Sequence, residues 1–322
     1  ATFEARGYTA WDPTSYAFIK DEVLCIPTAF CSYTGEALDK KTPLLRSMKA
    51  IETQGRRVLD LFGDDSSDRV TTTLGAEQEY FLISEKDYEK RLDIMLTGRT
   101  LFGYPPVKGQ ELEEHYFGAI RPTVNEFMKE LDDELWALGI SAKTKHNEVA
   151  PAQHELAPIF AETNRAVDEN LLTMEKMKLL ASHYGLVCLL HEKPFEGING
   201  SGKHNNWSLS ASKNLFDPGE SPMDNLRFLV FLTAVIQAVD DYQELLRLTA
   251  EKERCEAELE DLMARCAPGQ RPAVIGVNSV TTTYTLHAMR EMGLAIPQQI
   301  GLCGPGAWNW GDQMNWPELT AP

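Results

Sequence analysis

Four glutamates occur as two pairs within apolar parts of the sequence. Glu77 and Glu79 stand two residues apart in TTTLGAEQEYFLI (71–83), a stretch rich in β-branched and aromatic residues. A strand would place both side chains on one face, in a poorly solvated setting. Carboxylates that close repel each other, and a divalent cation would remove the cost of burying them together. The alternative is an edge strand with one wet face, on which two glutamates cost nothing.

Glu148 and Glu155 form the second pair, in HNEVAPAQHELAPIF (146–160), where two prolines indicate a fixed turn. His146 and His154 flank them. Each histidine is either a metal ligand or a polar group that holds the turn, and the second role is the commoner one for a neutral imidazole. Four carboxylates in two apolar segments are harder to explain as ordinary surface residues. We therefore interpret them as candidate metal ligands.

The segment EGINGSGKHNNW (196–207) has the glycine and lysine spacing of a Walker A loop, with Gly197, Gly202 and Lys203 in place. The next residue should be Ser or Thr, but it is His204, followed by poor helix formers. The histidine instead offers a nitrogen ligand from a loop whose glycines permit close approach to a substrate. Carboxylates with one imidazole and no thiolate suit Mg²⁺ or Mn²⁺, and two such ions indicate phosphoryl transfer.

Hydrophobic periodicity predicts the elements that must position these residues. Strands are expected in 20–34, 71–83, 146–160 (two strands joined by a turn) and 185–195. Helices are expected over 41–62, 85–96, 121–138, 164–184 and 224–266. Strands and helices follow one another without regular βαβ alternation, which favours the α+β class.

Composition excludes several classes of protein. The 322 residues carry a net charge of −17, so nucleic acid is not an expected partner. Six cysteines without CxxC pairing indicate reduced thiols in a cytoplasmic, soluble protein. No signal peptide is visible, and the apolar run from Phe228 is about 12 residues long, too short to span a bilayer. We expect no membrane partner.

Together these segments resemble glutamine synthetase, specifically its type III branch. The likeness is carried by GAEQEYFLI (75–83), HNEVAPAQHELAPIF (146–160) and LLHEKPFEGINGSGKHNNWSLS (189–210), and runs almost continuously from residue 1 to about 248. The resemblance implies a catalytic domain in which helices surround an antiparallel sheet. It also implies that the glycine loop is the family's NGSG-x-H element and that Lys203 makes no essential phosphate contact.

The resemblance implies two metal sites. Glu77 and His204 correspond to ligands of the metal that interacts with ATP. Glu79, Glu148 and Glu155 correspond to ligands of the metal near glutamate. Both ions are expected to be Mg²⁺ or Mn²⁺.

The resemblance also implies the substrate contacts. Asn199 and Gly200, with Glu79 beside them, fall where the family contacts glutamate. Asn206 and Ser208 fall where it contacts the nucleotide, although many relatives have histidine in place of Asn206.

The implied reaction converts ATP, glutamate and ammonia into glutamine, ADP and phosphate through a γ-glutamyl phosphate. Asp12 or Glu4 corresponds to the acidic residue near the ammonium site, and the sequence does not choose between them. The family builds its sites between adjacent subunits of stacked rings, so a large, dodecamer-like homo-oligomer is implied.

The expected domains are a remnant of an N-terminal β-grasp region (1–35), an incomplete catalytic domain (36–248) and a divergent tail (249–322). The tail includes RPAVIGVNSVTTTYTLHAMREMGLAIPQQIGLCGPGAWNW (271–310), which reads as strand, helix and strand, βαβ-like, and resembles part of the effector domain of the lac repressor family.

The family should supply phosphate-binding arginines and a further metal carboxylate where this tail stands. Its own arginines, 254, 265, 271 and 290, lack that spacing, so we expect impaired turnover. The alternatives are an inactive protein that binds metal or nucleotide, and a regulatory protein that binds a ligand through the tail.

Overall fold

The computed structural model describes residues 7–64, 69–104, 109–198, 202–242, 273–275 and 301–303. The chain divides into two compact units, Ala1–Leu232 and Thr233–Pro322. The first unit contains the four glutamates and the helices and strands around them.

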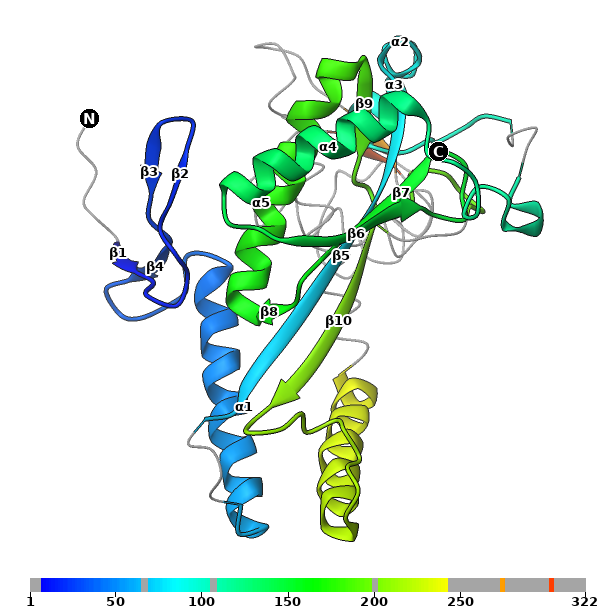
Figure 1. The fold of residues 1–322 in the computed structure, drawn as a ribbon. Coiled ribbons are helices and arrows are strands. Elements are labelled where there is room, and N and C mark those ends of the chain that lie inside the picture. Colours follow the sequence, from blue (N-terminus) through cyan, green and yellow to red (C-terminus); the bar gives the residue numbers. More distant parts are fainter. Residues whose placement is uncertain are drawn as a thin grey trace. The chain divides into compact units, whose positions relative to one another are not determined.

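A six-stranded sheet forms the centre of the first unit, and every pairing in it is antiparallel. Its longest strand, β5, pairs along its length with four others, as Figure 1 shows for β10. The strands are β5 (Thr71–Ser84), β6 (Ala142–Asn147), β7 (Gln153–Pro158), β8 (Ala161–Glu162), β9 (Leu186–Leu189) and β10 (Lys203–Ser210). The expected α+β class with an antiparallel sheet is thereby confirmed.

Helices α4 (Pro122–Ala137) and α5 (Thr163–Ala181) pack against one face of this sheet. Pro122 stands in the first turn of α4, where its missing N–H costs nothing. The even-numbered side chains of β5 face these helices because side chains alternate along a strand. The shared core contains, among others, Tyr80, Leu82, Phe127, Met128, Leu131, Leu156 and Met177.

The remaining helices of the first unit match the predicted positions with one exception. Helix α1 (Lys41–Leu61) agrees with the predicted range. The single helix expected over 85–96 is instead two short ones, α2 (Glu85–Tyr88) and α3 (Leu92–Thr97). Arg91 leaves the helical conformation between them, with φ −118° and ψ 88°, and its guanidinium binds the buried Asp93 carboxylate at 2.6 Å. We infer that the ion pair between Arg91 and Asp93 stabilises this non-helical conformation more than a continued helix would. The 3₁₀ turns are η1 (Glu111–Glu113) and η2 (Ser182–Tyr184).

Two antiparallel strand pairs precede α1, as the alternation in residues 20–34 partly predicts. They are β1 (Gly7–Trp11) with β4 (Thr28–Ser32), and β2 (Phe18–Lys20) with β3 (Val23–Cys25). Cys25, Cys31 and Cys188 are free thiols in the described part of the chain, as the cysteine pattern predicted.

One described helix, Pro222–Tyr242, is long and apolar enough to cross a bilayer by length and composition alone. It extends the apolar run from Phe228, which by itself is too short, on both sides to 21 residues. A single helix of this kind is weak evidence for membrane insertion, because helices of soluble proteins pass the same test.

The second unit contains β11 (Ala273–Ile275) and β12 (Gly301–Cys303), which pair in parallel. Both strands lie in the segment predicted to form strand, helix and strand, and the helix predicted between them lies outside the described residues. The predicted helical continuation beyond residue 242 lies outside the described residues.

Candidate active site

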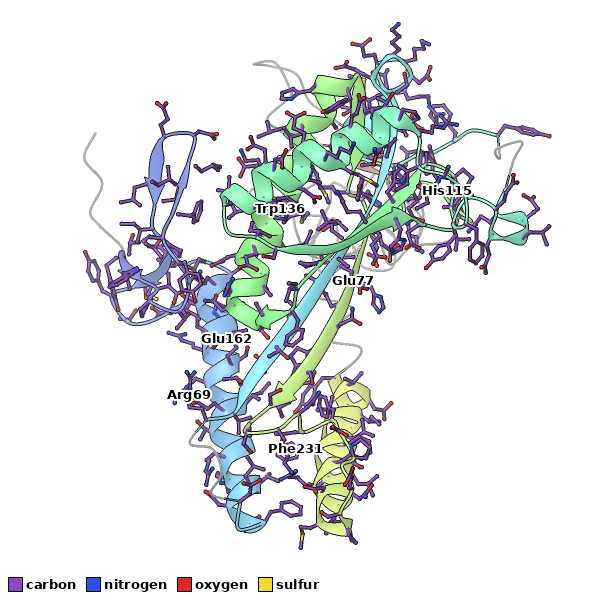
Figure 2. All side chains as sticks on the ribbon, viewed as in Figure 1. Arg69, Glu77, His115, Trp136, Glu162 and Phe231 are labelled. Carbon is purple, nitrogen blue, oxygen red and sulfur yellow. The ribbon has the colours of Figure 1, made fainter. Side chains whose placement is uncertain are left out.

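Glu77 and His204 lie directly opposite each other on neighbouring strands. The His204 Nδ1 is 3.0 Å from a carboxylate oxygen of Glu77. The sequence placed His204 in a loop, but the loop ends at Gly202 and His204 is the second residue of β10. Backbone hydrogen bonding to the long strand β5 extends β10 up to the glycines, so a strand fixes the imidazole. Figure 2 shows Glu77 about midway along β5.

The predicted nucleotide contacts follow on the same strand. Asn206 and Ser208 are two and four residues beyond His204, so alternation brings all three side chains to one face of the sheet. Ser208 Oγ is hydrogen-bonded to the Asn214 side chain at 3.0 Å. The predicted glutamate contacts, Asn199 and Gly200, lie outside the described residues.

Glu79 and Glu155 form the second opposed pair, on β5 and β7. Both are almost fully buried, at 9% and 8% exposed. The side-chain amide of Gln153 donates a hydrogen bond to Glu79 at 3.0 Å. Because Glu77 and Glu79 share one face of β5, the register of β5 with β10 and with β7 brings Glu77, Glu79, Glu155 and His204 to the same side of the sheet. The edge-strand alternative is therefore wrong, since β5 is paired on both sides.

His146 completes a compact donor cluster with Glu148 and Glu155. Its Nε2 lies 2.9 Å from Glu155 and its Nδ1 lies 3.4 Å from Glu148, and one donor atom from each residue falls within 4.8 Å of the others. Sequence reasoning favoured a turn-holding role for His146, whereas the structure adds it to the carboxylate cluster. The position of the turn in the sequence could have predicted this, because the turn lies midway between His146 and Glu155 and so pairs them across the β6–β7 hairpin.

His154 has the structural role that the sequence favoured. It is 4% exposed, lies on the helix-facing side of β7, and its Nδ1 is 2.9 Å from the Asn147 side-chain oxygen. Burial, reinforced by the charges of His115 and Arg121, lowers the pKa of His154 to about 3. His154 is therefore a neutral hydrogen-bonding group that holds the hairpin.

A loop histidine missed by sequence reasoning also supports the cluster. His115 Nδ1 is 2.7 Å from the backbone carbonyl oxygen of Glu148, and Figure 2 shows His115 close to the β6–β7 end of the sheet. The neighbouring Tyr116 ring meets His146 edge-on, with 5.4 Å between ring centroids. The His115 contact holds the backbone of Glu148, which lies in the turn after β6 rather than in a strand, and the Tyr116 ring packs against His146.

The electrostatics of this cluster match a cation site. Burial, a hydrogen bond with Glu148 and the charges of Glu148, Glu77 and Glu79 raise the pKa of Glu155 to about 8. Oxygen ligands with an imidazole suit Mg²⁺ or Mn²⁺. A divalent cation would neutralise the mutual repulsion that raises this pKa, so the residues present fit the implied metal.

Lys203 points away from these residues, which rules out a Walker A role in this structure. Alternation along β10 sends its side chain toward α5, where Nζ donates a hydrogen bond to Asn170 Oδ1 and lies 3.4 Å from the Met174 sulfur. Burial lowers the pKa of Lys203.

The ammonium-site candidates lie apart from this cluster or outside the described residues. Asp12 is buried next to α5, where Asn164 Nδ2 donates to it at 2.8 Å and Lys41 Nζ lies at 3.0 Å. Burial would raise the pKa of Asp12, but hydrogen bonds from Thr14, Asn164 and Lys41 outweigh it and lower the pKa to about 2. None of these partners is one of the four glutamates. Glu4 lies outside the described residues, so the choice stays a prediction.

The fold and the site define an α+β domain whose sheet carries a carboxylate and imidazole cluster on one face and helices on the other. The chain belongs to the glutamine synthetase family. The family description "Glutamine synthetase, catalytic domain" matches residues 54–270, and "Glutamine synthetase type III N terminal" matches residues 1–47. The catalytic match thus extends past the boundary near 248 that the sequence suggested.

Curated relatives agree with this membership. The chain is 58% identical over 246 residues to glutamine synthetase of Butyrivibrio fibrisolvens, and 53% identical over 253 residues to type-3 glutamine synthetase of Dictyostelium discoideum. These alignments cover 76% and 77% of this chain but only 35% and 34% of the relatives, so the chain spans about a third of their length. The solved structure of Plasmodium falciparum glutamine synthetase is 21% identical, with a TM-score of 0.47 over 65% of this chain and 42% of its own.

Proposed function

We propose that this chain provides the catalytic residues of a type III glutamine synthetase, which joins ammonia to glutamate at the expense of ATP. The observation that carries the proposal is the register of β5 with β10 and β7. It sets Glu77 against His204 and Glu79 against Glu155 on one face of the sheet. Membership in the family supports the assignment of this face as the catalytic one.

Two cation sites are proposed on this face. Glu77 and His204 would hold the cation on the nucleotide side. Glu79, Glu148 and Glu155, with His146 beside them, would hold the cation on the glutamate side. Bound divalent cations supply charge neutralisation for phosphoryl transfer.

The remaining side chains bind and orient the substrates. Asn206 and Ser208 lie further along β10, on the same face as His204, where they would contact ATP. The segment with Asn199 and Gly200 leads into that strand and would hold glutamate. The γ-carboxylate of the bound glutamate then attacks the γ-phosphate of ATP and ADP leaves. Ammonia next displaces phosphate from the resulting γ-glutamyl phosphate, which gives glutamine. Orientation and exclusion of water are the main contributions of the protein.

The proposed setting is a cytoplasmic homo-oligomer, in which Asp12 or Glu4 contributes to an ammonium site. Free thiols at Cys25, Cys31 and Cys188 are compatible with a reducing compartment.

Phosphate release from ATP tests the proposal. We expect release to require glutamate, ammonium and Mg²⁺ or Mn²⁺ together, and to fall at least about 100-fold in Glu79→Ala. Phosphate release that does not depend on glutamate or ammonium would identify a simple ATPase. Binding of metal and ATP with no turnover, even when a type III C-terminal region replaces residues 249–322, would identify an inactive relative.

A further inference from the structure

A buried polar network lies behind β5 and β10, on the face opposite the glutamates. Lys203 Nζ donates a hydrogen bond to Asn170 Oδ1 on α5. Asn170 Nδ2 lies 3.4 Å from Gln78 Oε1, and Gln78 Nε2 donates to the backbone carbonyl oxygens of Gly202 and Glu79. Gln78 and Asn170 are 1% and 6% exposed.

The network is attached to the point at which the glycine loop becomes β10. Lys203 pairs with Gln78 across the two strands, and His204 pairs with Glu77 at the next position. Gly202 is held on its other side as well, because a Cβ there would lie 3.0 Å from Glu192 Cα and 3.1 Å from the Leu190 carbonyl oxygen. The backbone entering β10 is therefore fixed from two directions.

A polar network in this position lowers the stability of the fold relative to an apolar one, which indicates a role other than stabilisation. A half-buried ammonium group and two buried amides cost free energy of desolvation that apolar side chains of similar size would not. None of the three side chains faces the proposed cations or substrates. What they hold in place is the backbone of Gly202 and Lys203, immediately before His204.

We propose that Lys203, Asn170 and Gln78 are positioning residues that anchor the start of β10 to α5 and so hold His204 opposite Glu77. The inference rests on the proposed role of Glu77 and His204 as cation ligands. Residues that orient metal ligands typically contribute 10- to 100-fold to metal affinity. The effect should fall on the cation held by His204 and not on the one held by Glu79, Glu148 and Glu155.

Calorimetric titration of the full chain with Mn²⁺ tests this. His204→Ala first identifies which class of Mn²⁺ sites depends on that imidazole. Lys203→Met and Asn170→Leu should each weaken the same class by about 10-fold and leave the other class within about twofold. Lys176→Met is the control: Lys176 is a buried lysine of α5 whose ion-pair partners in the described part of the chain are Glu134 on α4 and Asp21, and neither belongs to β10.

The double variant Lys203→Met/His204→Ala separates positioning from general damage. If Lys203 acts through His204, the double variant binds Mn²⁺ no more weakly than His204→Ala, because without the imidazole there is nothing left for Lys203 to position. Additive losses, or equal weakening of both site classes, would overturn the inference. Wild-type affinity at the His204-dependent Mn²⁺ sites in both Lys203→Met and Asn170→Leu would also overturn the inference. The two variants test it independently. Unchanged binding in His204→Ala would instead overturn the cation assignment in the proposed function.

Discussion

At the scale of single residues, the site is defined by repulsion that the fold does not relieve. Glu155 is buried against Glu148 and close to Glu77 and Glu79, and its pKa rises to about 8 as a result. A carboxylate cluster of this kind is unstable as four anions in a poorly solvated place. The proposed cations account for its presence.

The first prediction concerns the carboxylates themselves. Glu79→Ala and Glu155→Ala should each weaken Mn²⁺ binding more than about 10-fold, because each removes a proposed ligand. Calorimetric titration measures the change. Glu130→Ala provides the control, since Glu130 is a carboxylate of α4 that contacts Tyr184 and His183. Equal affinity in the wild type and in both ligand variants would disprove the assignment.

The second prediction concerns pH in the metal-free protein. The pKa of Glu155 is about 8 in the folded chain and has an ordinary value of 4.5, so the folded state holds this proton more tightly than the unfolded state. Its contribution to stability is therefore complete below about pH 4.5 and is lost as the pH rises through about 8. The free energy of unfolding, measured by urea denaturation, should fall between about pH 4.5 and about pH 8.

Glu155→Gln and added Mn²⁺ are the controls for that prediction. A glutamine cannot ionise, so its variant should lose less stability over the same interval. Mn²⁺ should reverse the trend, because deprotonated carboxylates bind it and stabilisation by the ion grows with pH. A fall of equal size in the wild type and in Glu155→Gln would assign the pH effect to other groups.

At the scale of elements, the pairing of β10 with β5 and the alternation of side chains explain why neighbouring residues of β10 have different roles. Odd and even positions point to opposite faces, so His204 joins the glutamates and Lys203 joins α5. The site therefore depends on where β10 starts. Gly202 determines that point, because its missing side chain permits close backbone approach to the segment after β9.

The third prediction tests that close approach. Gly202→Ala would place a Cβ 3.0 Å from Glu192 Cα and 3.1 Å from the Leu190 carbonyl oxygen, both backbone atoms that cannot simply rotate away. We expect the His204-dependent Mn²⁺ affinity to fall about 10-fold, as for other changes behind a metal ligand.

Gly75→Ala is the matched control, because a Cβ there meets Phe160 and Asn206 only at ordinary contact distances of 3.6 and 3.8 Å. Its Mn²⁺ affinity should remain within about twofold of the wild type. If Gly202→Ala binds Mn²⁺ as well as Gly75→Ala does, the backbone at Gly202 has room to move and the strand start is less constrained than proposed.

At the scale of the whole molecule, the chain joins a type III N-terminal match and a catalytic-domain match to a further segment. The matches cover residues 1–47 and 54–270. The tail was predicted to depart from the family and to resemble part of a repressor effector domain. Its two described strands are parallel, but its arginines lie outside the described residues. The resemblance of the tail stays a prediction.

The fourth prediction is that this chain turns over glutamate slowly. Phosphoryl transfer needs cations fixed around the γ-phosphate, and loss of one preorganised donor typically costs about 10²–10³-fold. Ammonia-dependent phosphate release should be at least about 100-fold faster in a hybrid in which a type III C-terminal region replaces residues 249–322. Comparable rates in the two proteins would mean that the tail supplies these groups itself.

Residue types and spacing predicted the candidate site and most of the elements around it, and the structure confirms those elements. Glu77 and Glu79 stood out because period-two alternation in an apolar stretch places both on one face. Helices α1, α4 and α5 followed from periodicity along the chain. These are local signals, and they persist whatever the element packs against. The interrupted helix over 85–96 was missed because the ion pair between Arg91 and Asp93 competes with helix continuation.

Only the tertiary structure decided which residues meet. Strand register pairs His204 with Glu77, and Glu79 with Glu155, from segments far apart in the sequence. Register depends on how β5, β7 and β10 align over α4 and α5, and a shift by one residue would turn every side chain to the other face. The same register directs Lys203 toward Asn170 on α5, a contact that the sequence did not predict. The alternation of side chains follows from the sequence of each strand, whereas the register between strands is set by packing in the shared core.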